Sequence, residues 1–195
     1  IKLAYSETDL IIDEDTQYSQ GTTESINGKI ENRFALANGS ITAGIDFYSD
    51  NAMLYYRGPT ASVLTETGPE KSRNVGIYAQ ARIEPTDRAR LSYGLRADFQ
   101  KFTDLDGNTT SNNGFSGNLS GAYDVTEQVT VSAGYSSVWG GVPLAENFIF
   151  NPAWIYPSEG FDPVTSSNVF VAARAGFGAW DVSGKIFQTK IDNAR

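Results

Sequence analysis

Apolar and polar residues alternate along most of this chain. In the segment 74–84 the odd positions, Val75 through Ile83, are apolar and the even positions are mostly polar. In the segment 90–100 the odd positions are again apolar, and the even positions carry no apolar side chain. Successive side chains of a β-strand point to opposite faces, so a period of two predicts strands with one apolar and one polar face.

We therefore expect an all-β protein, an antiparallel meander of about nine long strands. The expected strands cover residues 1–12, 24–37, 40–56, 74–84, 89–101, 114–123, 129–138, 167–175 and 180–191. Several are longer than the five or six residues typical of globular proteins, and about ten tilted residues cross a bilayer. The longest purely apolar run, Val169–Ala173, is too short for a transmembrane helix, which needs about 18 apolar residues.

Short and long connections alternate between these strands. The short turns fall at 37–40, 85–88, 124–128 and 176–179, and the long polar loops are expected at 13–23, 50–73, 101–113 and 139–166. An outer-membrane β-barrel has tight periplasmic turns and long extracellular loops. Aromatic residues also gather near both strand ends, as in interfacial girdles, with Trp139 counted in the band near the long loops. The pattern predicts part of a transmembrane β-barrel.

The short turns allow the strand register to be predicted. The expected opposite pairs are Leu36 with Ile41, Ile83 with Ala89, Tyr123 with Val129, and Ala175 with Trp180. In all four hairpins these pairs bring the two apolar faces together, as a pairing register requires.

Composition excludes several functions. The net charge of −8 disfavours nucleic acid as a partner, because phosphate binding needs clusters of Lys and Arg. The chain has no cysteine and no histidine, which removes thiolate ligands, the commonest metal ligand and the commonest general base. No pair of carboxylates is indicated in a low-dielectric pocket. We expect no enzyme activity and no cofactor.

Short motifs from Asn74 onward resemble a known family. They are Gly76–Gln80, Gly94–Asp98, Phe115–Asp124, Ala133–Ser136 followed by Val142–Glu146, Asp162–Asn168 and Ile191–Ala194. In this order they resemble barrel strands of TonB-dependent outer-membrane receptors. This chain differs from the family pattern in four places: Ala97 replaces a frequent tyrosine, Trp139-Gly140-Gly141 lacks an arginine that is common there, and Val164 and Phe170 each replace a glutamate.

The resemblance implies a 22-stranded barrel with an N-terminal plug in the bacterial outer membrane. Residues 1–195 would then be a partial β-barrel domain, with the plug, the TonB box and the closing strands outside it. The implied function is uptake of a scarce metal chelate, such as a ferric siderophore, haem or cobalamin, driven by the TonB complex. The missing histidine makes haem the less expected of these ligands. Outer-membrane lipid is a further expected partner.

Under this interpretation the long loops bind the ligand. Tyr55, Tyr56 and Arg57 in one loop combine aromatic surface with a guanidinium, which suits an aromatic or anionic chelate. The longest loop offers three further aromatic candidates, Trp139, Trp154 and Tyr156. Arg96 and Asp98, two residues apart on the polar face, are expected to belong to a charge network in the lumen.

A weak calcium-loop pattern occurs at Asp104, Asp106 and Asn108, where alternate oxygen ligands flank a glycine turn. The later bidentate glutamate is absent, so an ordinary polar turn is the simpler interpretation.

Two other functions fit the strand pattern. One is a passive porin or a small structural barrel, which would usually have an even number of strands. The other is a soluble β-sandwich that binds a partner through its loops. An isolated open piece of barrel would expose two unpaired edges and an apolar face, so it would need detergent or an oligomer.

Overall fold

The computed structural model describes residues 1–14, 17–58, 65–142, 144 and 161–193, and these form one antiparallel sheet. Its strands are β1 (Lys2–Glu14), β2 (Gln17–Leu36), β3 (Gly39–Arg57), β4 (Thr65–Thr86), β5 (Ala89–Thr103), β6 (Thr109–Asp124), β7 (Val129–Gly141), β8 (Val164–Phe177) and β9 (Trp180–Asp192). In the described part of the chain, no helix is long and apolar enough to span a membrane.

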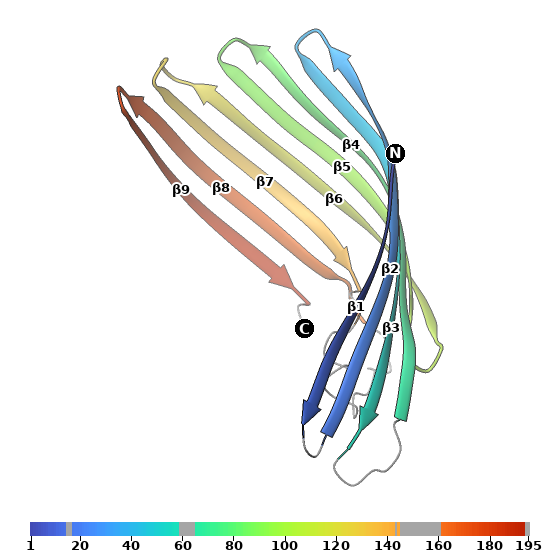
Figure 1. The fold of residues 1–195 in the computed structure, drawn as a ribbon. Coiled ribbons are helices and arrows are strands. Elements are labelled where there is room, and N and C mark those ends of the chain that lie inside the picture. The colour runs from blue at the N-terminus through green and yellow to red at the C-terminus, as the bar shows by residue number, and fades with distance from the viewer. Residues whose placement is uncertain (15–16, 59–64, 143, 145–160, 194–195) are drawn as a thin grey trace.

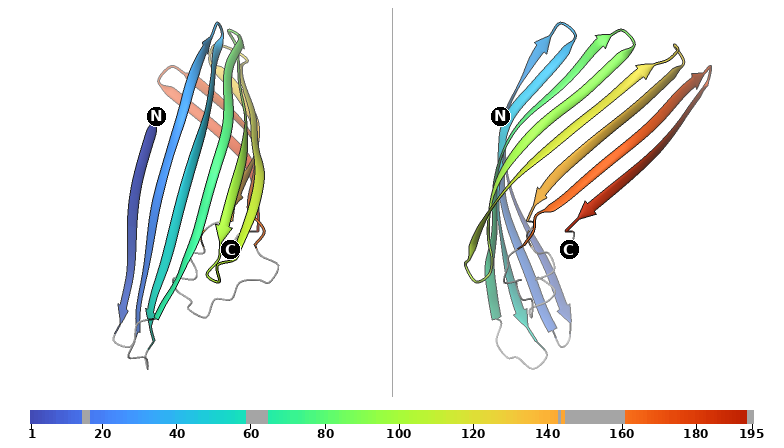
Figure 2. Two further views of the ribbon diagram at one scale, coloured as in Figure 1. Left: turned by 90° about the vertical axis from the view of Figure 1, so that its right-hand side faces the viewer. Right: turned by 180° about the vertical axis from the view of Figure 1, so that it is seen from behind.

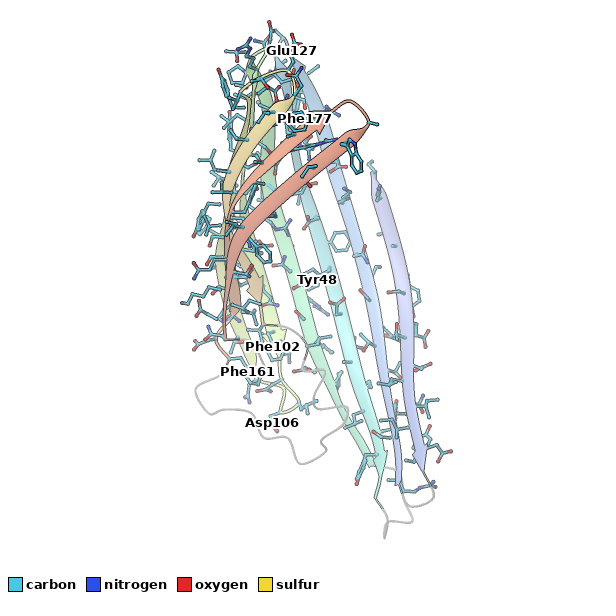
Figure 3. The ribbon with its side chains drawn as sticks, turned by 90° about the vertical axis from the view of Figure 1, so that its left-hand side faces the viewer. Tyr48, Phe102, Asp106, Glu127, Phe161 and Phe177 are labelled. Carbon is cyan, nitrogen blue, oxygen red and sulfur yellow. The ribbon has the colours of Figure 1, made fainter. Side chains whose placement is uncertain are left out.

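The strands are neighbours in the order of the sequence, from β1 to β9, which confirms the expected meander. The sheet is twisted and curved, with β1 and β9 at its two open edges (Figures 1 and 2). Glu127 and Phe177, at short turns, lie at one end of the strands, and Asp106, in the β5–β6 connection, lies at the other (Figure 3). The two kinds of connection therefore lie at opposite ends.

Three of the predicted long loops are mostly strand. β2 begins at Gln17 rather than 24, β4 at Thr65 rather than 74, and β6 at Thr109 rather than 114. The predictions of loops at 13–23, 50–73 and 101–113 were therefore wrong in extent. In the strand parts that the sequence did not predict, 17–23, 65–73 and 109–113, both faces are mostly polar, so the alternation that marks a strand in the sequence is lost even though the backbone pairing continues.

The predicted registers were wrong by two residues in all four hairpins. Leu36 pairs with Gly39, Ile83 with Leu91, Tyr123 with Val131, and Ala175 with Val182. A shift of two residues keeps every side chain on its face, so coincidence of apolar faces could not distinguish these registers. In the first hairpin Gly39 is already a strand residue, with φ of 151°. A Cβ there would lie 2.1 Å from the Arg82 carbonyl oxygen on β4, which only glycine avoids.

The two faces of the sheet differ in chemistry. The outer face carries large exposed apolar side chains, among them Leu95 at 75%, Phe115 at 81% and Ile186 at 83% exposure. The inner face carries buried polar groups such as Asp98 and Gln100. This is the reverse of a soluble sheet, in which the apolar face is the buried one. The apolar cluster of buried residues is small and lies on the inner face, near the ends of the strands opposite the short turns.

Candidate functional site on the inner face

An ion-pair network occupies the middle of the inner face. The Arg96 guanidinium on β5 donates to both carboxylate oxygens of Asp46 on β3, at 2.6 and 2.7 Å. It also donates to Asp98, two residues along its own strand, at 2.7 to 2.9 Å. Asn74 on β4 donates to the same Asp98 carboxylate at 2.7 Å. Arg96 therefore joins β5 to β3, and Asp98 joins β5 to β4, through charge-assisted hydrogen bonds.

Gly76 provides the space for this network. Gly76 lies between Asp46 and Asp98 in the strand register, and the Arg96 side chain extends across it. A Cβ at position 76 would lie 1.9 Å from Arg96 Nη2 and 2.8 Å from Asp46 Oδ1. The Arg96 guanidinium also lies 5.8 Å from the centre of the Tyr78 ring. Arg96 and Asp98 are the charge pair expected from the sequence, and the structure adds Asp46, Asn74 and Gly76 to them.

A second group of hydrogen bonds joins the end of β7 to the inner face. Gln100 Nε2 donates to the Val142 carbonyl oxygen at 2.8 Å, and the Val142 N–H donates to Gln100 Oε1 at 2.8 Å. Gln100 Nε2 also donates to Ser72 at 2.9 Å and to Tyr48 at 3.3 Å. Gly141, the last residue of β7, has φ of +73°, and the next residue, Val142, is hydrogen-bonded to Gln100 on the inner face.

Apolar contacts also pack the β7–β8 connection against the inner face. Ala52 and Leu54 on β3 form a buried cluster, against which Tyr56, Leu105 and Leu144 pack. On β5, Phe102 is 3% exposed and its ring meets that of Phe161 edge-on at 6.0 Å (Figure 3). Leu144 and Phe161 stand on either side of residues 145–160. Both described flanks of the β7–β8 connection therefore pack against the inner face of β3 to β5.

Trp139 belongs to β7 rather than to the following loop, where the sequence had placed it. A Cβ at Gly114 would lie 2.1 Å from the Trp139 ring, so the ring packs directly on the β6 backbone. The Trp139 N–H donates to Ser116 Oγ at 3.0 Å. Trp139 and Arg96 line one inner-face hollow of about 380 Å³, together with Tyr78, Gln80 and Asn118. Trp139 thus lies on the inner face and not in an outer aromatic band.

Tyr55, Tyr56 and Arg57 form the end of β3 and are paired with β2. Tyr56 packs against the Leu54 cluster, whereas Tyr55, its neighbour in the strand, points to the opposite face. The Arg57 guanidinium lies 5.8 Å from the centre of the Tyr18 ring. The structure therefore does not bring these three side chains to one surface. Trp154 and Tyr156 lie outside the described residues.

The Asp104–Asn108 segment forms a compact turn. Both Asp104 carboxylate oxygens accept hydrogen bonds from Asn108, one from its N–H at 2.8 Å and one from its Nδ2 at 3.2 Å. The Gly107 N–H donates to the Asp104 carbonyl oxygen at 3.1 Å. Within the described ranges, no group of three His, Cys, Asp or Glu residues could hold a metal ion. The calcium site at Asp104, Asp106 and Asn108 stays a prediction.

No sequence pattern indicates the role of Gln100, because one polar residue on a polar face looks like any other. The partners of Arg96 could more nearly have been predicted from the sequence. Asp46, Gly76 and Asp98 occupy one row across β3, β4 and β5, and the correct register would have aligned them. The site as a whole is a polar, internally paired surface with an aromatic side chain beside it.

Comparison with known proteins identifies the family. The model of the family "TonB dependent receptor-like, beta-barrel" matches residues 2–194. The heme transporters BhuA of Brucella ovis and Brucella abortus are each 30% identical over 176 residues, covering 84% of this chain and 25% of theirs. The chain thus spans about a quarter of the length of these curated relatives.

Solved structures show the same fold. The copper transporter OprC superposes with a TM-score of 0.80 at 14% identity, over 97% of this chain and 35% of its own. The FrpB iron transporter from Neisseria meningitidis, in its apoprotein form, gives 0.76 at 16% identity, over 98% and 34%. The ferripyoverdine receptor of the outer membrane of Pseudomonas aeruginosa gives 0.72 at 14% identity, over 98% and 30%. The chain belongs to the β-barrel family of TonB-dependent receptors, proteins of the bacterial outer membrane.

Proposed function

We propose that this chain is part of the barrel of a receptor that takes up a scarce metal chelate across the outer membrane. Such a chelate would be a ferric siderophore, haem or cobalamin. Loops at the end opposite the short turns would capture it, and the TonB complex would drive its passage through a plug domain outside residues 1–195. The outer face of the sheet would contact outer-membrane lipid. The family is one of receptors and transporters rather than enzymes.

The match to the BhuA heme transporters over 84% of the chain carries this proposal. It is supported by the two faces of the sheet. The exposed apolar outer face suits lipid, and the polar inner face suits the lumen of a barrel. A soluble β-sandwich packs its apolar faces against each other, away from water. The apolar face of this sheet is exposed, so a β-sandwich is disfavoured.

The position of the β7–β8 flanks supports a ligand site at the loop end of the lumen. Val142, Leu144 and Phe161 all contact the inner face of β3 to β5. A connection held in this way narrows the space through which a chelate would pass. Among the ligand contacts expected from the sequence, we retain Tyr55, Tyr56, Arg57, Trp139, Trp154 and Tyr156. Trp139 is the strongest of them because it shares a hollow with Arg96.

The test is growth on a single metal source. The full-length protein is expressed in a bacterium that lacks its own chelate receptors, and haem, a ferric siderophore or cobalamin is supplied as the limiting nutrient. One of these should restore growth, and deletion of TonB should abolish the effect. Growth that does not depend on TonB would indicate a passive pore and overturn the proposal.

A second measurement concerns binding. Ligand added to the purified protein in detergent should quench tryptophan fluorescence, and Trp139→Leu should reduce that quenching. Trp180→Leu is the matched control, because Trp180 is 75% exposed at the β8–β9 turn, at the opposite end of the strands. Equal loss of quenching in both variants would argue against a site at the loop end.

A further inference from the structure

Three cations form a cluster on the outer face of β4 and β5. Lys71 and Arg73 lie two residues apart on β4, and Arg73 is directly opposite Lys101 on β5. By the alternation along each strand, these three side chains point to the same face as Val75 and Phe99, which are 45% and 49% exposed. The basic cluster, Lys71, Arg73 and Lys101, therefore belongs to the face that carries the exposed apolar side chains.

The basic cluster lies at the border of the apolar band. From the short turn, the outward positions are apolar along 75–83 on β4 and along 91–99 on β5. Each stretch has about the length of a membrane-crossing strand, roughly 9 to 11 residues. The next outward positions on both strands are Arg73 and Lys101. The cluster thus lies where the strands leave the apolar band, at the end opposite the short turns.

These charges have no carboxylate partner within 4 Å among the residues that the structure describes. Like charges directly opposite each other on neighbouring strands destabilise a sheet. An anion between Arg73 and Lys101 would remove this cost. Ser49 is opposite Arg73 on β3, and Ser111 is opposite Lys101 on β6, so two hydroxyl groups flank the pair. Guanidinium, ammonium and hydroxyl donors together suit the oxygens of a phosphate.

A hollow of about 290 Å³ continues from the cluster towards β1. Lys71 and Arg73 form one wall, and Tyr5, Ser49 and Glu24 lie among its other lining residues. Cations, hydroxyl groups and carboxylates in one hollow can bind phosphates and also accept hydrogen bonds from sugar hydroxyls. This combination matches a sugar headgroup that carries phosphate better than it matches a simple phospholipid.

We propose that the basic cluster binds the phosphate groups of a phosphorylated glycolipid in the outer leaflet, with the acyl chains of the lipid lying along Val75 and Phe99. The inference rests on the membrane placement in the proposed function, because that placement puts the end opposite the short turns at the outer leaflet. Basic clusters beside a membrane attract anionic headgroups by the same physics.

The test uses the full-length protein in detergent and purified lipid A as the probe, in its bisphosphorylated and dephosphorylated forms. Native mass spectrometry measures the fraction of protein that retains lipid. The double variant Arg73→Gln/Lys101→Gln should retain at least fivefold less bisphosphorylated lipid, and Arg73→Gln alone about threefold less. Dephosphorylated lipid should bind the unmodified protein at least fivefold more weakly.

Lys190→Gln is the matched control. Lys190 is on the same face and at the same end of β9, but it is already paired with Asp192 at 2.8 Å, so lipid retention should not change. Equal retention by the double variant, or equal binding of both lipids, would overturn the inference. Should the double variant not fold, lipid binding by the unmodified protein must still weaken as salt rises, and insensitivity to salt would overturn it. The TonB-dependent growth assay is independent of these outcomes, so the proposed function and this inference fail separately.

Discussion

Gln100 and Val142 exchange two hydrogen bonds, one in each direction, although neither residue is more than 1% exposed. The amide side chain of glutamine has one donor group and one acceptor, which match a backbone N–H and C=O. Gln100 therefore pairs with the chain beyond β7 much as another strand would. This single side chain joins the start of the β7–β8 connection to the inner face, near the strand ends opposite the short turns.

Replacing Gln100 should release this attachment. In Gln100→Leu the Val142 N–H and carbonyl oxygen lose their partners, and a buried polar group without a partner costs about 1 to 3 kcal/mol. We expect a loss of about 2 to 4 kcal/mol in the free energy of unfolding, and faster amide hydrogen exchange at Val142. Gln80→Leu is the control, because Gln80 donates only to Ser92 and Asn118, side chains with other access to solvent. Similar losses in the two variants would contradict a special role for Gln100.

Gly76→Ala should disturb the Arg96 network. The new Cβ would meet Arg96 Nη2 at 1.9 Å, and the guanidinium can withdraw only by giving up hydrogen bonds to Asp46. Arg96 is 29% exposed in its side chain, so solvent screens part of the loss and we expect about 1 to 3 kcal/mol of destabilisation. Gly184→Ala on β9 meets nothing within 4 Å and should be neutral. The measurement is the free energy of unfolding of each variant, obtained by chemical denaturation.

Removing Arg96 should lower the free energy of unfolding more than removing an exposed arginine does. In Arg96→Leu the Asp98 side chain, 4% exposed, keeps only the hydrogen bond from Asn74. Breaking one partner of a buried ion pair costs about 3 to 5 kcal/mol, and partial exposure of Arg96 places the expected loss near the lower end. Arg174→Leu removes the pair with Asp181, whose side chains are 70% and 53% exposed, and should leave stability unchanged. High salt should not reduce the difference between the two variants.

The alternation of residues was enough to predict the strands and their apolar face, because both depend on a period of two, and the short turns predicted the meander. It could not distinguish Leu36 opposite Ile41 from Leu36 opposite Gly39, since both keep the same faces together. The turn geometry decides the register. At Gly39 the decisive contact is with the Arg82 carbonyl oxygen of β4, which no inspection of the hairpin alone would reveal.

The candidate site was predicted only in part for a similar reason. Arg96 and Asp98 are close in sequence, so their pairing could be expected from strand periodicity. Asp46 and Val142 reach the same region from distant parts of the chain, through the strand register and through the turn at Gly141. Trp139 was expected in a loop, and its contact with Gly114 depends on the β6–β7 packing. Long-range contacts of this kind leave no local pattern.

The outer face offers a direct test of the membrane placement. Phe115 on β6 is 81% exposed, and Asn118 on the same strand lines the inner hollow. Arginine on a lipid-facing strand costs about 2 to 4 kcal/mol at the bilayer midplane and less towards the interface, so Phe115→Arg, opposite Ala97, should cost about 1 to 3 kcal/mol. Asn118→Arg in a polar lumen should cost little. The measurement is urea unfolding of the full-length protein in lipid vesicles. On a soluble sheet the order would be reversed or lost, because an arginine at an exposed position changes stability by less than about 0.5 kcal/mol. A stable Phe115→Arg variant would therefore remove lipid as the partner of the outer face.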